Sequence, residues 1–144
     1  MEKGIDFFDC VLGEFDLPKQ DVRSCPPLTL AYIGDAIYEL VIRSMVVASH
    51  HTQVNKLHKK SSDLVKAGTQ AKMIAGLYDL LTEEERAVYK RGRNAKSHTA
   101  AKNADIQDYR RATGFEALMG MLYMTGQTGR MMELIKKGLD MQEK

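Results

Sequence analysis

Two acidic residues of this chain stand beside small residues in segments with helical periodicity. Asp35 follows Gly34 in the middle of "LTLAYIGDAIYEL", and Glu116 lies between Gly114 and Gly120 in "TGFEALMG". A glycine inside a helix costs about 1 kcal/mol relative to alanine, so its presence indicates that another helix or a ligand must come close. If the two helices cross at their glycines, the two carboxylates face each other within reach of one hard cation. Carboxylates that share a Mg²⁺ ion and leave water on it are suited to phosphodiester hydrolysis.

Alternative interpretations exist for each of these acidic residues. Glu39 lies four residues after Asp35, on the same side of the helix, and is either a further ligand or the partner of Arg43 at i+4. Asp35 and Glu116 would themselves be ordinary solvated charges if the two helices did not meet, because acidic residues are common on helix surfaces. The arrangement of the two helices therefore decides between these interpretations.

Basic residues are concentrated in one part of the chain. The formal net charge is only +2, yet residues 90–111 carry seven basic and two acidic side chains. Such an excess suits a polyanion, although a merely solvated face is the alternative, and phosphates attracted there would arrive next to Glu116. The residues predicted to contact nucleic acid are Lys59, Lys60, Lys90, Arg91, Arg93, Asn94, Lys96, Lys102, Arg110 and Arg111.

The elements that must position these groups are all predicted to be helices. Apolar residues recur at helical spacing, and no alternating β-branched run or hairpin turn signal interrupts them. The expected helices cover 5–15, 28–47, 54–81, 82–92, 106–126 and 128–144. The third stretch is expected to break into a short and a longer helix, near Ser61 or Gly68. Residues 93–105 lack apolar periodicity and are expected to form a long loop, a feature that is usually functional or disordered.

Local signals fix several helix ends. Thr82 and Glu85 have the spacing of a capping box, and either Asp105 or Asp108 is expected to cap the helix that carries Glu116. Thr128 is expected to start the last helix. The predicted apolar stripe of the helix 28–47 consists of Ile33, Ile37, Leu40, Val41 and Met45, and that of 106–126 of Phe115, Leu118, Met119 and Leu122.

Length and composition are those of one globular domain. The chain has 144 residues, of which 44 % are hydrophobic and 28 % charged, enough to bury a core of its own. No stretch approaches the roughly 18 apolar residues of a membrane span, and the acidic start lacks a signal-peptide pattern. We therefore expect a cytoplasmic protein with no membrane partner.

Both acidic segments resemble the ribonuclease III family. "LTLAYIGDAIYEL" is similar to the family's signature helix, approximately "ERLEFLGDAVLEL", and "TGFEALMG" is similar to "DTVEALIG". The resemblance is greatest to the Mini-ribonuclease III branch, through "LAYIGDAIYE", "LHKKSS", "EEERAVYKRGRNAKS" and "FEALMG" in that order. It implies an all-α helical bundle, with residues 1–144 forming a single nuclease domain and no double-stranded-RNA-binding domain.

The resemblance also implies an activity and an assembly. Asp35 and Glu116 would be the catalytic and metal-binding residues of an endoribonuclease that uses Mg²⁺, or Mn²⁺ in its place, to cut double-stranded RNA and leave 5′ phosphates. Each site would cut one strand, so a homodimer is expected, with the signature helix near its interface. The candidate contact residues are Tyr32, Ile33, Ile37 and Met45.

Several expectations depend on the resemblance alone. They are maturation of precursor large-subunit (23S) ribosomal RNA and assistance by a ribosomal protein. Three acidic positions of the family patterns are Leu28, Ala31 and Thr113 here, which leaves the number of metal ions open. A competing class is a non-catalytic ribonuclease III-like RNA-binding protein of the ribosome, and a weaker one is a helical protein-interaction module that does not respond to metal.

Overall fold

The computed structural model describes residues 6–49, 53–96 and 105–142, and in these ranges it contains helices and no strand, which confirms the all-α prediction. The elements are α1 (Phe7–Glu14), the 3-10 turn η1 (Val22–Ser24), α2 (Pro27–Ser49), α3 (Val54–Val65), α4 (Ala67–Leu77), the 3-10 turn η2 (Tyr78–Leu80), α5 (Glu83–Asn94), α6 (Ile106–Met124) and α7 (Thr128–Gln142).

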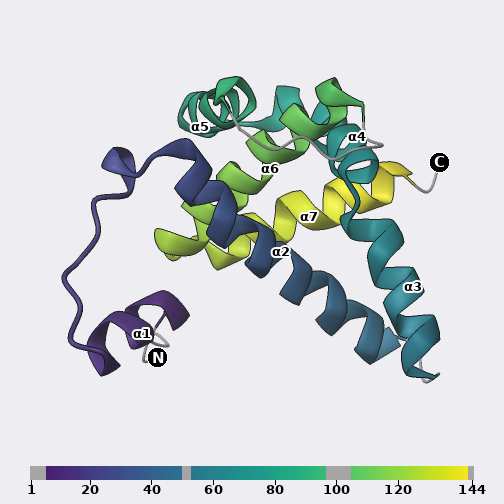
Figure 1. Cartoon of the computed structure of the whole chain (residues 1–144), viewed down its shortest axis with the longest axis horizontal. Coiled ribbons are helices and arrows are strands. Elements are labelled where there is room, and N and C mark those ends of the chain that lie inside the picture. The colour runs from purple at the N-terminus through teal and green to yellow at the C-terminus, as the bar shows by residue number, and fades with distance from the viewer. Residues whose placement is uncertain (1–5, 50–52, 97–104, 143–144) are drawn as a thin grey trace.

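Helix α6 lies at the centre of the bundle and crosses α2 (Figure 1). Its residues 114–123 are all buried except Glu116, which is half-buried. Helices α4, α5 and α7 pack around it. The expected apolar stripe of this helix is confirmed, because Phe115, Leu118, Met119 and Leu122 are fully buried. The central part of this helix is buried on most of its faces, so it holds the Glu116 carboxylate in surroundings that contain little water.

The predicted helix ends are set by local capping groups. Thr82 Oγ1 accepts a 3.1 Å hydrogen bond from the backbone N–H of Glu85, while Glu85 Oε1 accepts a 2.9 Å bond from the N–H of Thr82. These two bonds form the predicted capping box. Asp105, rather than Asp108, caps α6 by accepting from the N–H of Gln107 at 2.7 Å. Helix α7 begins at Thr128, as predicted.

The 54–81 stretch breaks at Lys66, close to the predicted Gly68 and away from Ser61. Three side chains satisfy the carbonyl groups that the end of α3 leaves without helical partners. Thr69 Oγ1 donates to Asp63 O at 2.7 Å, Tyr38 Oη to Leu64 O at 2.8 Å, and Gln70 Nε2 to Val65 O at 2.8 Å. Side chains that follow the break, and one from α2, therefore fix this corner, which we call the α3–α4 corner.

The predicted boundary between α5 and the loop that follows it is wrong. Helix α5 continues to Asn94 instead of ending at Gly92, so Arg93 and Asn94 are helical and do not begin the expected loop. Gly92 remains helical because α5 and α6 touch there: a methyl group on Gly92 would lie 2.9 Å from Gly114 Cα. Most of the expected loop, including Lys102, lies outside the described residues.

The predicted apolar stripe of α2 is correct only in part. The buried face of α2 consists of Leu30, Ala31, Gly34, Tyr38, Ile42 and Val46. In the predicted stripe, Ile33, Ile37 and Val41 are half-buried, whereas Leu40 is 54 % exposed and Met45 39 % exposed. Helix α2 thus has two apolar faces, and the one that contains Gly34 packs on α6 because only a small residue lets the two backbones approach.

A partly buried ion-pair network joins the start of α5 to the start of α7. Arg130 donates from Nε to Glu85 Oε2 at 2.9 Å and from Nη2 to Glu85 Oε1 at 2.8 Å. The same guanidinium also donates to Leu80 O at 2.9 Å and to Glu133 Oε1 at 2.7 Å. Glu85 is only 4 % exposed, so the capping carboxylate of α5 depends on Arg130 for its charge compensation.

We expect Arg130→Met to lower the free energy of unfolding by about 3 kcal/mol, because it leaves the buried Glu85 carboxylate uncompensated. Arg43→Met is the matched control, since the Glu39–Arg43 pair is exposed and such i,i+4 pairs contribute about 0.5 kcal/mol or less. Urea denaturation measures both. Equal effects of the two substitutions would contradict the prediction.

The same pair predicts how this stability depends on pH. Hydrogen bonds from Arg130 hold the pKa of Glu85 below its usual value of 4.5. The stabilisation is therefore fully present above about pH 4.5 and is lost as the pH falls through the lower, folded-state pKa of Glu85.

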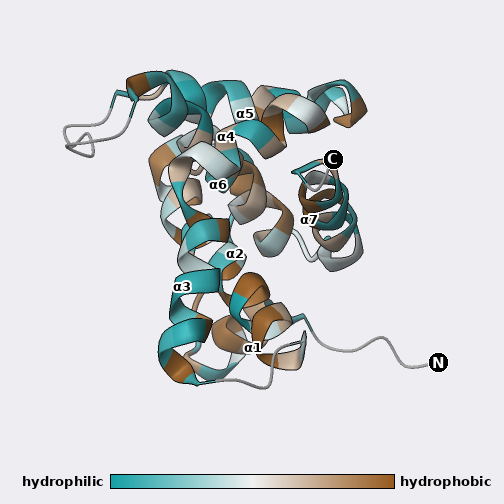
Figure 2. Ribbon diagram, turned by 90° about the vertical axis from the view of Figure 1, so that its right-hand side faces the viewer, coloured by the Kyte–Doolittle hydropathy of each residue, from teal (hydrophilic) through white to brown (hydrophobic). Residues whose placement is uncertain are grey.

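Helix α1 is hydrophobic and lies at the opposite end of the molecule from α5 (Figure 2). Its Phe8 ring packs edge-on against Tyr123 at the end of α6, with 5.6 Å between the ring centroids. Phe7 remains 67 % exposed. None of the described helices combines the length and the apolarity needed to cross a membrane.

Candidate active site

The two acidic segments meet where α2 crosses α6. A methyl group on Gly34 would overlap the backbone oxygen of Glu116 and lie 2.7 Å from the backbone nitrogen of Gly120. A methyl group on Gly120 would overlap the backbone oxygen of Leu30. The glycines are therefore required by direct backbone contact between the helices. Asp35, the residue after Gly34, is thereby placed next to Glu116, as the sequence predicted.

The two carboxylates have different surroundings. Asp35 is exposed, whereas Glu116 is half-buried in the bundle. Burial, and then the negative charge of Asp35, raise the pKa of Glu116 to about 8. Such a shift is typical of carboxylates held close together without a compensating cation, and strongly shifted pKa values cluster at functional sites. A cation bound between the two carboxylates would therefore stabilise their ionised forms.

The donor set fits a hard divalent cation that keeps most of its water. Within residues 6–49, 53–96 and 105–142, no cluster of three or more His, Cys, Asp or Glu side chains is placed to hold a metal. The protein thus offers the two carboxylates of Asp35 and Glu116. Magnesium is commonly bound by one or two carboxylates, with water and substrate phosphates completing its coordination.

Gln70 is part of this site and was missed by the sequence analysis. Its side chain is only 1 % exposed, and Nε2 lies 3.4 Å from Glu116 Oε2. Tyr38 is fully buried, and its ring packs edge-on against that of Phe115, with 5.2 Å between the two ring centroids. A glutamine in an ordinary helical segment carries no signal of such a role, because its partner is 46 residues away in the chain.

Glu39 does not join the two carboxylates. Its Oε1 accepts a 2.6 Å hydrogen bond from Arg43 Nη2, which makes it the i+4 pair that was one of the two alternatives. The carboxylate site therefore contains Asp35 and Glu116 without Glu39.

The predicted RNA-binding residues lie on three helices. Lys59 and Lys60 are exposed on α3, where they border, with Lys56, a shallow hollow of about 360 Å³. Those on and just after α5 are Lys90, Arg91, Arg93, Asn94 and Lys96, all exposed except the half-buried Arg93. Arg110 and Arg111 are exposed near the start of α6, fewer than two turns before Glu116. The basic side chains thus lie on the same helices, or on direct neighbours of the helices, that build the carboxylate site.

Aromatic rings support part of the basic surface on α5. The Arg93 guanidinium lies over the Tyr89 ring, 5.6 Å from its centroid, and Lys90 Nζ lies 6.0 Å from the centroid of Tyr78. Arg91 Nη2 donates to Cys25 O at 3.3 Å. These contacts restrain the long side chains, which lowers the entropy that they lose on binding a phosphate.

Comparison with known proteins bears directly on this arrangement. Residues 28–127 match the model of the ribonuclease III domain family. The chain belongs to the ribonuclease III family. The match includes both helices of the crossing, with Asp35 and Glu116, and the family assignment makes the chain an endoribonuclease.

Within the ribonuclease III family the chain groups with the Mini-ribonuclease 3 proteins. It is 50 % identical to the Mini-ribonuclease 3 of Clostridium tetani over 92 % of this chain and 87 % of that protein. It is 51 % identical to that of Enterococcus faecalis over 81 % and 89 % of the two chains. The crystal structure of a Fusobacterium nucleatum protein superposes with a TM-score of 0.76 at 27 % identity, over 85 % of this chain and 98 % of that one.

The departures from the ribonuclease III sequence pattern can now be placed in the structure. Ala31 is buried against the core, Leu28 is 38 % exposed, and Thr113 Oγ1 donates to Tyr109 O at 2.9 Å. None of the three supplies a carboxylate. The chain therefore has fewer acidic side chains at these positions than the family's common pattern has.

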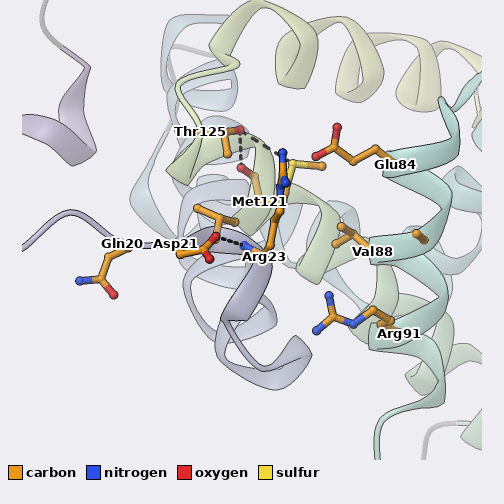
Figure 3. Close-up of a pocket in the computed structure, with 10 residues that line it drawn as sticks. Gln20, Asp21, Arg23, Glu84, Val88, Arg91, Met121 and Thr125 are labelled. Atoms are coloured by element: carbon orange, nitrogen blue, oxygen red, sulfur yellow. Dashed lines mark hydrogen bonds between the residues drawn. The ribbon is translucent and has the colours of Figure 1, made fainter.

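A larger hollow is separate from the carboxylates. A hollow of about 570 Å³ lies between the segment 20–23, α5 and the end of α6. Figure 3 shows the side chains that line it, which include Arg23, Glu84 and Arg91. Neither Asp35 nor Glu116 lines it. This hollow is therefore distinct from the place where α2 crosses α6.

Proposed function

We propose that this ribonuclease III family member hydrolyses double-stranded RNA at the α2–α6 crossing, where Asp35 and Glu116 hold Mg²⁺. The observation that carries the proposal is the backbone contact at Gly34 and Gly120, together with the interaction between the Asp35 and Glu116 carboxylates. Mn²⁺, which accepts similar oxygen ligands, is expected to replace Mg²⁺. Titration with either metal would count the ions at each site.

The two carboxylates have distinct tasks in this mechanism. A bound divalent cation would supply Lewis acidity toward the phosphate and acidify a water molecule for attack. Glu116 must lose its proton before it can act as a ligand, because its pKa is raised to about 8. The exposed Asp35 is the carboxylate that faces solvent and arriving substrate. Hydrolysis would leave a 5′ phosphate and a 3′ hydroxyl.

The basic residues would hold the substrate by its backbone. The side chains on α3, α5 and the start of α6, together with Lys102, present positive charge to phosphates. RNA duplexes are held mainly through phosphates, 2′-hydroxyls and shape. We further propose that the natural substrate is precursor 23S ribosomal RNA in the cytoplasm and that a ribosomal protein assists. These last points rest on the resemblance to Mini-ribonuclease III proteins.

Cleavage of a long RNA duplex tests the proposal. We expect wild-type protein to cut it in the presence of Mg²⁺ or Mn²⁺, EDTA to stop cleavage, and Asp35→Ala to lower the rate at least about 10³-fold, since metal stabilisation contributes several kcal/mol. Glu39→Ala is the matched control on the same helix, and it should retain cleavage because Glu39 pairs with Arg43.

The outcomes separate the competing functions. If the wild-type protein binds the duplex but leaves it intact over a range of Mg²⁺ and Mn²⁺ concentrations, a non-catalytic RNA-binding role replaces the proposal. Cleavage that survives both EDTA and Asp35→Ala would show that the reaction occurs elsewhere. Circular dichroism and light scattering establish that each variant keeps its fold and assembly.

We also propose that the protein acts as a homodimer through the second apolar face of α2. Tyr32 is 82 % exposed and Met45 39 % exposed, while Ile33 and Ile37 are half-buried beside them. An apolar hollow of about 650 Å³ borders this face and includes Ile37 and Met45 in its lining. A contiguous apolar surface of this kind is typical of subunit contacts. A second copy, related by twofold symmetry, would cover it.

We expect Tyr32→Asp to weaken the dimer by roughly 30-fold or more, since an aromatic residue central to an interface contributes about 2 kcal/mol. Sedimentation velocity over a concentration series measures the dimer dissociation constant. Val54→Asp is the control, because Val54 is 67 % exposed on α3 and does not line the hollow that borders the proposed interface. A Tyr32→Asp protein that dimerises as tightly as the control would refute this interface.

A further inference from the structure

Gln70 is the buried polar side chain that lies between the α3–α4 corner and the carboxylate site. It comes from α4, is 1 % exposed and is surrounded by the core. Its Nε2 donates to Val65 O at 2.8 Å and lies 3.4 Å from Glu116 Oε2. One amide group therefore contacts both a fixed backbone carbonyl and the carboxylate of α6.

Burial of this amide is unfavourable for stability. Gln70 Oε1 has no hydrogen-bond partner among the described residues, and a buried unsatisfied acceptor costs about 1–3 kcal/mol. A methionine of nearly the same shape would fill the space without that cost. Packing therefore does not explain a glutamine here, and its polar contacts through Nε2 must provide the reason.

The two contacts of Nε2 differ in what they explain. The carbonyl of Val65 is one of three at the α3–α4 corner that accept side-chain hydrogen bonds, together with those of Asp63 and Leu64. The corner is thus already held by Thr69 and Tyr38. The contact with Glu116 is different, because Gln70 Nε2 brings an amide donor to a carboxylate that also interacts with the like-charged Asp35.

We infer that Gln70 is a positioning residue for the metal site: its amide ties Glu116 Oε2 to the α3–α4 corner and orients the Glu116 carboxylate toward Asp35. Removal of a group that hydrogen-bonds to a metal ligand and orients it typically lowers metal affinity or activity 10- to 100-fold. The inference rests on the proposed function, because it assigns Glu116 as a metal ligand. It adds a residue on α4 to a site otherwise built from α2 and α6.

Direct Mn²⁺ binding tests the inference without relying on activity. Isothermal titration with Mn²⁺ at pH 8.5 compares wild type, Gln70→Met, Glu116→Gln and Thr69→Val, with melting temperatures measured in EDTA. Thr69→Val is the matched control, because it removes a hydrogen bond of the same corner and does not touch Glu116. Gln70→Asn is the second variant if Gln70→Met does not fold, since it keeps an amide but is one methylene too short.

We expect Gln70→Met to weaken Mn²⁺ binding at least about 10-fold while its melting temperature in EDTA is unchanged or higher. Thr69→Val should bind Mn²⁺ as tightly as wild type. In cleavage assays, the Mg²⁺ concentration that gives half-maximal rate should rise for Gln70→Met by a similar factor. A purely structural role would lower the melting temperature and leave Mn²⁺ affinity unchanged.

The results that overturn the inference differ from those that overturn the proposed function. Unchanged Mn²⁺ affinity in Gln70→Met, or equal weakening in Gln70→Met and Thr69→Val, refutes positioning by Gln70. In both cases, the proposal that Asp35 and Glu116 form a metal site would still be supported if Glu116→Gln no longer bound Mn²⁺. Equal Mn²⁺ binding by wild type and Glu116→Gln refutes the metal site itself, and the inference with it.

Discussion

Glu116→Gln is expected to abolish RNA cleavage and, at the same time, to stabilise the metal-free protein at alkaline pH. Loss of a charged ligand should lower the cleavage rate at least about 10³-fold, because metal stabilisation contributes several kcal/mol to the transition state. The stability effect has the opposite sign, because the uncharged amide avoids the cost of placing an ionised carboxylate in the bundle beside Asp35.

The sign of the pH dependence follows from the raised pKa. Glu116 has a folded-state pKa of about 8 against an ordinary value of 4.5. Below pH 4.5 Glu116 is protonated in both the folded and the unfolded chain, and it does not lower the free energy of unfolding. As the pH rises from about 4.5 to 8, the unfolded chain loses this proton more readily, so the folded protein loses stability. Above pH 8 this loss of stability no longer increases.

Thermal unfolding in EDTA at pH 5, 7 and 9 measures this effect. We expect the melting temperature of Glu116→Gln to equal that of wild type near pH 5 and to exceed it at pH 9. The stability difference at pH 9 should be roughly 2 kcal/mol or more, since one pKa unit corresponds to about 1.4 kcal/mol.

Metal should reverse the order of stability. Added Mg²⁺ stabilises a protein that binds it only when folded, so wild type should gain in melting temperature and Glu116→Gln should not. Glu39→Gln is the control, because its exposed pair with Arg43 predicts little change in either assay. A difference between Glu116→Gln and wild type that does not vary with pH would contradict the assigned ionisation.

The sequence allowed good predictions wherever the relevant partner is near in the chain. Thr82 and Glu85 are three residues apart, and their capping box could be predicted because both groups belong to one helical turn. Asp105 and Thr128 marked helix starts for the same reason. The glycines beside Asp35 and Glu116 also predicted the crossing of their helices, because a glycine inside a helix is unfavourable unless another helix or a ligand comes close to it.

Contacts between distant segments could not be predicted in this way. The pairing of Glu85 with Arg130 and the approach of Gln70 to Glu116 each join residues more than 40 positions apart. The prediction of which face of α2 is buried was incomplete for a related reason. The helix has two apolar faces, and only the fit against α6 selects the one with Gly34. Such selections depend on backbone distance, which hydrophobic periodicity does not encode.

Gly34→Ala should test that backbone distance most directly. The added methyl group would overlap the backbone oxygen of Glu116, and a backbone obstacle cannot rotate away as a flexible side chain can. Helix α2 must therefore move away from α6. Overpacking of this kind typically costs 1–3 kcal/mol or more, of which the higher helix propensity of alanine returns about 1 kcal/mol. We expect a net loss of stability and a separation of Asp35 from Glu116.

The effect on catalysis should exceed the effect on folding. A misplacement of about 1 Å in a reacting group can lower a rate roughly 100-fold, so Gly34→Ala should cut RNA at about 1 % of the wild-type rate or less even where it remains folded. Gly129→Ala is the matched control: Gly129 is also helical, and a methyl group there meets nothing within 4 Å. It should therefore fold at least as stably as wild type and cut normally. If Gly34→Ala behaves like Gly129→Ala in both assays, the close crossing of α2 and α6 is not what holds the two carboxylates together.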